Sequence, residues 1–247
     1  QTHDEYLDLC IEILENGASA MPERLRSFVT ETVEQQRFFH WELEFRDVLK
    51  NGGFDLVLGN PPWVALEWKD SSVFSDENCI PAVLGMSAPD TRAFIERSAS
   101  DKSKALLSQE FIRLSGYFAL LELWPYVDLK SSSKNTYKYF TYLGFLLAAD
   151  DGVIGLIQED GLLEEAPAVA ARKKIYHRLR YHFQFQNELL LFAEVHDAKR
   201  YSINVFGSFK KSVRFDHIGN LFSVSSLEQC FDDRNLLNPV PAIKDER

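Results

Sequence analysis

The segment GGFDLVLGNPPWVALEW, residues 52–68, constrains the fold most, because it joins a nearly continuous apolar run to two consecutive prolines. Residues 54–58 have the pattern of a strand that is buried on both faces of a parallel sheet. Gly59 then permits a sharp backbone turn at the carboxyl end of the strand. Open α/β sheets bind their ligands at this end. The segment therefore predicts an α/β fold with a site at residues 60–63.

The four residues of that turn favour one kind of ligand. Asn60 and Pro61 each precede a proline, which biases both toward extended backbone, and each proline has a fixed φ. The prolines lack an N–H, so the turn offers carbonyl acceptors, and Asn60 adds a side-chain oxygen. Trp63 adds a flat face for a base, and such stacking contributes about 1–3 kcal/mol per base. Two acceptors beside an aromatic ring suit a planar group with an exocyclic –NH2, whose lone pair stays free to attack.

FDLVLGNPPW resembles the catalytic motif of class I S-adenosylmethionine-dependent amino-methyltransferases, most of all the gamma-class adenine-N6 DNA methyltransferases. FHWELEF, residues 39–45, resembles a segment of type IIG restriction–modification enzymes and their phage-defence relatives. The resemblance implies a Rossmann-like fold with a mixed, mostly parallel sheet and flanking helices. It also implies DNA as substrate, S-adenosyl-L-methionine as cofactor, and catalytic roles for Asn60, Pro61, Pro62 and Trp63.

The resemblance also suggests cofactor-binding residues. In the gamma class an acidic residue and an aromatic lie about sixteen residues before the catalytic Asn, which here gives Glu44 and Phe45. The alternative is a surface Glu beside a core Phe. The glycine-rich loop that binds the cofactor's methionine moiety in this family is absent from the sequence. We therefore expect an incomplete catalytic domain, inactive as an isolated chain, whose partners are an upstream cofactor-binding half and a target-recognition domain of the same polypeptide.

Sequence patterns divide the chain into three parts. Residues 1–39 predict a helical connecting segment, residues 40–231 a partial catalytic domain, and residues 232–247 a linker or tail. A mainly helical insertion is predicted at residues 64–134. Helix 135–149, with Asn135 as N-cap, and strand 153–157 follow it, and the family places this strand beside the catalytic one. The patterns further predict a helix at 167–181, strands at 182–186 and 201–206, and a hairpin at 213–224.

The net charge of -10 argues against a self-sufficient DNA-binding surface. Basic residues are nevertheless dense between residues 172 and 182, with a further pair at 199–200. Their alternative interpretation is a solvated helix face. The candidates for contact with DNA phosphates are Arg172, Lys173, Lys174, Arg178, Lys199 and Arg200.

Other sequence features concern metal binding, cellular location and possible partners. The three cysteines lack metal-ligand spacing, so we expect no metal, and their odd number favours a reducing, cytoplasmic location. No signal peptide and no membrane-spanning apolar run is found, so no membrane partner is expected. A half sheet would expose a strand edge, to be covered by the N-terminal helices, by a second copy in a homo-oligomer, or by another partner.

The predicted function is methyl transfer to N6 of an adenine flipped out of duplex DNA, in a restriction–modification or phage-defence enzyme. One alternative is an RNA-adenine or protein-glutamine N-methyltransferase, because these acceptors also present a planar –NH2. Another is a non-catalytic module, derived from a methyltransferase, that binds DNA or serves assembly.

Overall fold

The structure of the chain is a computed structural model, which describes residues 3–68, 74, 79–123, 125–193 and 195–230. It divides into two compact units, Gln1–Asp47 and Val48–Arg247. The division lies beyond residue 39, where the sequence predicts the end of the connecting segment. The predicted tail, 232–247, lies outside the described residues.

The first unit is helical. It holds α1 (His3–Asn16), the 3-10 turn η1 (Gly17–Ala20), α2 (Glu23–Gln36) and α3 (Trp41–Glu44), while α4 (Arg46–Lys50) contains the division between the units. Gly17, with φ +74°, follows the end of α1, as expected for a residue just beyond a helix. The helix α2 ends at Gln36, and Arg37 after it takes the left-handed conformation, with φ 47°.

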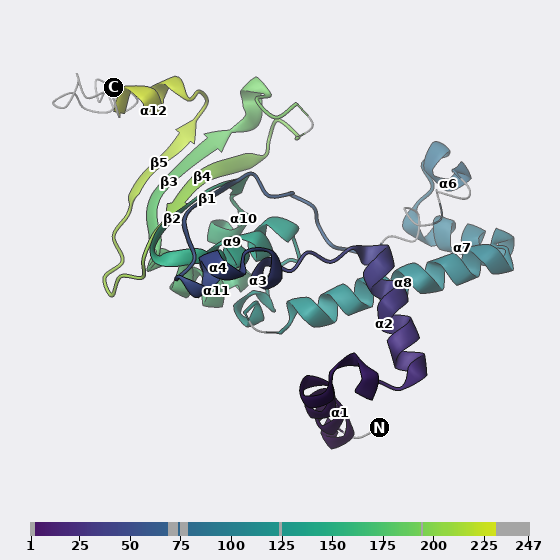
Figure 1. Cartoon of the computed structure of the whole chain (residues 1–247). Helices are drawn as coiled ribbons and strands as arrows, with labels where there is room; N and C mark the ends of the chain where they lie inside the picture. The colour runs from purple at the N-terminus through teal and green to yellow at the C-terminus, as the bar shows by residue number, and fades with distance from the viewer. Residues whose placement is uncertain (1–2, 69–73, 75–78, 124, 194, 231–247) are drawn as a thin grey trace. The chain divides into compact units, whose positions relative to one another are not determined.

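The second unit is built on one five-stranded sheet in the order β1-β2-β4-β3-β5. Figure 1 shows these strands as a single curved layer. The strand β1 is parallel to β2, β3 is parallel to β5, and β4 is antiparallel to both of its neighbours. The predicted mixed sheet is thus confirmed, with two of its four strand pairs parallel and two antiparallel. The strands are β1 (Phe54–Gly59), β2 (Ala148–Glu159), β3 (Leu179–Gln186), β4 (Arg200–Phe206) and β5 (Asp216–Leu221).

The predicted neighbour of the first strand is also found, since Val57 pairs with Ile154 in a parallel ladder. The prediction that β1 is buried on both faces was wrong. Its only partner among the described strands is β2, and Leu56 and Leu58 are 55% and 70% exposed. A long apolar run indicates a strand that can be buried, whereas its burial depends on neighbours that are not part of the described sheet.

Helices cover one face of the sheet. They are α9 (Thr136–Leu147), α10 (Gly161–Glu164) and α11 (Val169–Tyr176), with the 3-10 turns η2 (Val127–Leu129) and η3 (Ala166–Ala168). Ile154, Leu156 and Phe206 of the sheet pack there with Leu162 and Ile175 of the helices. The opposite face carries Phe183, Phe185 and Tyr201, which pack with Leu227 of α12 (Ser225–Cys230).

The predicted helical insertion contains α6 (Ile80–Val83), α7 (Ala88–Ser98) and the long α8 (Asp101–Leu121). Two predictions further along the chain were wrong. The helix predicted at 167–181 ends at Tyr176, and β3 begins at Leu179 because Leu179, Phe183 and Phe185 enter the core. The residues of the predicted hairpin instead form one strand, β5, which pairs with β3 so that Ile218 and Leu221 join Phe183 in the core.

Candidate active site

The four residues singled out by the sequence follow β1 directly, at the edge of the sheet where the parallel strands end. Asn60 and Pro62 are exposed, Pro61 is buried and Trp63 is half-buried. Gly59 pairs with Leu156 of β2, so the turn lies beside the last residues of β2. A parallel pair of strands thus presents Asn60 where ligands bind in open α/β sheets.

The turn after β1 is tied to the start of α9. The Pro62 carbonyl accepts a hydrogen bond from the Thr136 hydroxyl, and the Thr136 N–H donates to the Val64 carbonyl at 2.9 Å. The Leu66 N–H donates to the Lys134 carbonyl at 2.7 Å. The Pro62 carbonyl is therefore occupied. Within the described part of the chain, no hydrogen bond uses the Asn60 side chain or the Pro61 carbonyl.

Trp63 is held against the sheet. Its indole N–H donates to the Ile157 carbonyl at 3.3 Å. Its ring lies 5.1 Å from that of Phe192 and 6.0 Å from that of Tyr201, measured between centroids. Phe192 and Tyr201 are not among the site residues predicted from the sequence, because a strand pattern does not reveal which side chains pack across its face. The three rings form a rigid aromatic wall beside Asn60.

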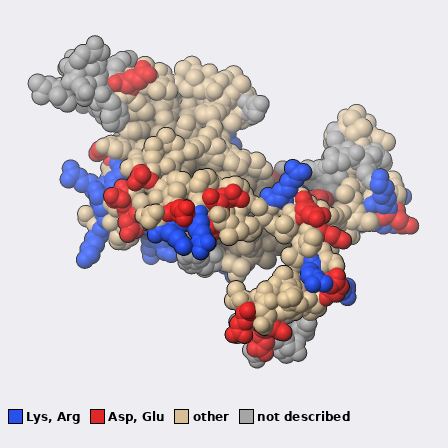
Figure 2. Space-filling model, in the orientation of Figure 1, with Lys and Arg blue, Asp and Glu red and all other residues tan. Residues whose placement is uncertain are grey.

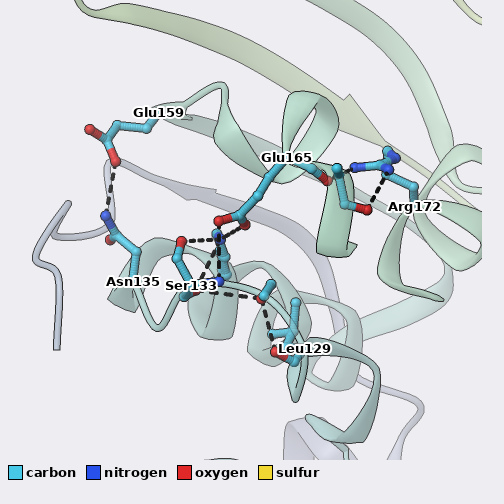
Figure 3. Close-up of polar contacts among 9 residues, drawn as sticks. Leu129, Ser133, Asn135, Glu159, Glu165 and Arg172 are labelled. Carbon is cyan, nitrogen blue, oxygen red and sulfur yellow. Dashed lines mark hydrogen bonds and ion pairs between the residues drawn. The ribbon is translucent and has the colours of Figure 1, made fainter. Parts of the chain in front are cut away.

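A polar group borders the same edge (Figure 3). Asn135 occupies the N-cap position of α9 as predicted, yet its side chain makes no cap bond and instead donates to Glu159 Oε2 at 2.9 Å. Lys199 Nζ donates to the other Glu159 oxygen at 2.8 Å. Lys199, a predicted DNA contact, is therefore neutralised by a carboxylate at the end of β2.

Beneath this group lies a buried ion pair. Lys138 of α9 is 1% exposed and pairs with Glu165, and its ammonium also donates to the Ser133 carbonyl at 3.0 Å and hydroxyl at 2.8 Å. Burial alone would raise the pKa of the Glu165 carboxyl, but the bonds from Lys138 and Ser133 hold it below its ordinary value. Arg172 donates to the backbone carbonyls of Glu165 and Ala166 (Figure 3). The network joins the start of α9 to the segment before α11.

A second buried carboxylate follows β2. Asp160 is 3% exposed and lies 2.8 Å from His182 Nε2, while Gln184 donates to its other oxygen. His182 Nδ1 is 2.9 Å from Nδ1 of His217, whose ring stacks on that of His182. Burial raises the pKa of Asp160, but the bonds from His182 and Gln184 outweigh it, so the pKa lies below the ordinary value.

Ionised Asp160 should therefore stabilise the fold. Its folded-state pKa is below the unfolded value of about 4, so its contribution is present above pH 4 and is lost as the pH falls through the folded pKa. We expect Asp160→Asn to lower the free energy of unfolding by about 1–3 kcal/mol at pH 7 and to flatten its acid dependence. Urea titrations from pH 7 to pH 3 measure both. The exposed Asp151→Asn serves as control, and an equal loss at pH 3 and pH 7 would contradict the prediction.

The predicted cofactor residues lie in the first unit. The Phe45 ring stacks on Trp41 at 5.4 Å, and Glu44 is exposed at the end of α3. In the described residues no glycine-rich loop joins a strand to a helix at the carboxyl edge of the sheet. These residues therefore do not by themselves make a complete site for S-adenosylmethionine.

The six predicted DNA contacts do not form one surface. Lys199 and Arg200 lie at the start of antiparallel β4, hence at the carboxyl edge with Asn60, and Arg200 pairs with Glu164 at 2.7 Å. Lys173, Lys174 and Arg178 lie between the last turn of α11 and the amino end of β3, at the opposite edge. Lys174 pairs with Asp128 at 2.6 Å, Arg178 lies 5.2 Å above the Phe145 ring, and Arg172 caps carbonyls as described above.

The described residues hold neither a candidate metal site nor a candidate membrane span. No group of three or more His, Cys, Asp or Glu side chains is placed to hold a metal ion there. No described helix is both long and apolar enough to cross a membrane.

Comparison with known proteins found a family to which part of the chain is similar. A sequence model of the family Eco57I restriction-modification methylase matches residues 6–112, which include β1 and Asn60–Trp63. The match supports a methylase of the restriction–modification class, and hence a DNA methyltransferase. No curated protein and no solved structure shows significant similarity to the chain.

Proposed function

We propose that this chain binds the acceptor base in an adenine-N6 DNA methyltransferase of restriction–modification or phage-defence type. The observation that carries the proposal is the pair of unused acceptors, the Asn60 side-chain oxygen and the Pro61 carbonyl, on a turn anchored beside an aromatic wall. The match to a restriction-modification methylase family over residues 6–112 supports DNA as the substrate.

In the proposed reaction the adenine leaves the duplex, because its N6 cannot reach a methyl donor while it is paired. The Asn60 oxygen and the Pro61 carbonyl accept the two N6 protons, which aims the nitrogen lone pair away from the turn. The exposed part of Trp63 packs on the base. Catalysis by this chain is then largely positioning of the nucleophile, which reduces the entropy cost of the transfer.

S-adenosylmethionine is the donor that the family resemblance implies, and it would supply an electrophilic methyl group. Because the described residues do not complete its site, we assign none of its contacts beyond the earlier proposal for Glu44 and Phe45. The exposed edge of β1 favours completion of the sheet by further strands or by a partner. The same edge would suit an assembly module without catalysis, which is our second candidate.

The test compares three acceptors. The complete gene product is incubated with radiolabelled S-adenosylmethionine and either duplex DNA, RNA of the same sequence, or a glutamine-containing peptide. We expect label in DNA alone, and mass spectrometry of the digested DNA should identify it as N6-methyladenine. Label in the RNA or in the peptide would identify that molecule, and not DNA, as the methyl acceptor. DNA binding without any methyl transfer would favour the non-catalytic module.

A further inference from the structure

Two acid-free stretches of the sequence meet at the amino edge of the sheet, away from Asn60. Residues 166–187 and 198–215 contain no Asp or Glu, in a chain that has 37 acidic residues. The first stretch includes α11 and β3, and the second includes β4 and the loop that leads to β5. We refer to the cations gathered here as the amino-edge basic surface: Lys173, Lys174, His177, Arg178, Arg180, Lys210, Lys211 and Arg214.

The loop between β4 and β5 is fixed to this edge by its backbone. The Lys210 N–H donates to the His177 carbonyl at 2.9 Å, and the Lys210 carbonyl lies 2.7 Å from His177 Nδ1. The Gly207 N–H donates to the Arg178 carbonyl at 2.9 Å, and Arg180 donates to the Ser208 carbonyl. These bonds therefore fix the loop, with its Lys210, Lys211 and Arg214, beside the end of α11 and the start of β3.

Four of these cations are unpaired. Lys173, Lys210, Lys211 and Arg214 are exposed, and none makes an ion pair or a side-chain hydrogen bond within the described residues. Burial lowers the pKa of Arg180, and the neighbouring charge of Arg178 lowers it further, which shows that positive charges are crowded here. Figure 2 shows blue side chains projecting at the side of the molecule where Figure 1 places the β4–β5 loop.

The charge changes sign along the edge. Asp55, Asp150 and Asp151 are exposed near the amino ends of β1 and β2, and Asp216 begins β5. An anion would therefore approach on the α11–loop side and not along the whole edge. The Phe209 ring is stacked on His177 at 4.8 Å and is 57% exposed, so it borders the basic side chains of the loop.

We propose that the amino-edge basic surface binds the phosphate backbone of duplex DNA without sequence preference, as a contact separate from the target-base site at the carboxyl edge. Phosphates at regular spacing match fixed cations, and each neutralised phosphate releases counterions, so the binding depends steeply on salt. A second contact of this kind holds the DNA while the target base binds at the carboxyl edge of the sheet. The inference rests on the proposed function only in taking DNA as the substrate.

The test measures duplex binding by fluorescence anisotropy, with the complete gene product and a labelled duplex of arbitrary sequence, between about 50 and 200 mM salt. No methyl donor is present, so the outcome is independent of whether adenine methylation is correct. We expect Lys210→Ala/Lys211→Ala/Arg214→Ala to weaken binding on the order of tenfold at low salt. Its log–log salt slope should be shallower by about 2.7, at about 0.9 for each lost phosphate contact.

The matched control is Lys102→Ala/Lys104→Ala/Arg113→Ala on α8, which removes three positive charges elsewhere in the same unit. Thermal melts verify that both variants fold. An equal loss in the control, an unchanged slope in the basic-edge variant, or no binding by the parent protein would overturn the proposal. A defect confined to phosphatidylserine vesicles, with duplex binding intact, would assign the surface to membranes instead.

Discussion

Asn60→Ala should reduce methyl transfer by about 10²- to 10³-fold or more, with little change in stability. The substitution removes one of the two acceptors that orient the nucleophile, and misplacing a reacting atom by about 1 Å costs on the order of 10²-fold. Fixed polar groups at a reacting centre contribute to a similar extent. Asn60 is exposed and makes no side-chain bond in the described structure, so unfolding should change by less than about 0.5 kcal/mol.

Single-turnover methylation with the complete gene product, alongside urea unfolding of each variant, measures both quantities. Asn51→Ala is the matched control, because Asn51 is also exposed and lies in the turn before β1. Asn60→Asp keeps an acceptor oxygen and should lose less activity than Asn60→Ala. Normal methylation by Asn60→Ala would remove the basis of the proposed function.

Lys138→Met should be the most destabilising of these changes. It deletes the cation of a buried pair and leaves the Glu165 carboxylate without its main partner, in a network that also joins Ser133 to the segment before α11. Removing one member of a buried ion pair costs about 3–5 kcal/mol. Glu165 is partly accessible, so the lower part of that range is expected. Urea unfolding at pH 7 measures the loss.

Two further variants separate the pair from simple loss of charge. Lys134→Met breaks the more exposed contact with Glu122, at 3.3 Å, and should cost no more than about 1 kcal/mol. Lys138→Met/Glu165→Leu removes both charges and should recover most of the stability lost in Lys138→Met. If the double variant is as unstable as the single one, the loss arises from the missing hydrogen bonds to Ser133 and not from the unpaired carboxylate.

Local pattern was sufficient for the elements around the candidate site. The apolar run, Gly59 and the prolines predicted β1 and its turn, and residues 135–157 predicted α9 and β2 in the correct order. Such predictions succeed because strand periodicity, glycine freedom and the fixed φ of proline act within a few residues. The sequence could also indicate that the turn offers acceptors, since proline has no N–H at any position in a fold.

The pairing of strands in the sheet could not be predicted from the sequence. The residues of the predicted hairpin form β5 beside β3, where Ile218 and Leu221 pack in the same cluster as Phe183. Likewise, a run of basic residues predicts positive charge, but it does not predict which of these side chains form ion pairs within the protein. Lys199 pairs with Glu159, forty positions away in the sequence, and is not a free cation.

The sequence alone determined that β1 is a strand, that a sharp turn follows it, and that Asn60 and Pro61 offer rigid acceptors. These properties belong to the residues themselves. The tertiary structure decided which acceptors stay open, since Thr136 occupies the Pro62 carbonyl and leaves that of Pro61 unused. It also decided that Trp63 stands against Phe192 and Tyr201, and that the basic residues divide between two edges. These outcomes depend on contacts between distant segments, which only packing of the sheet and its helices brings together.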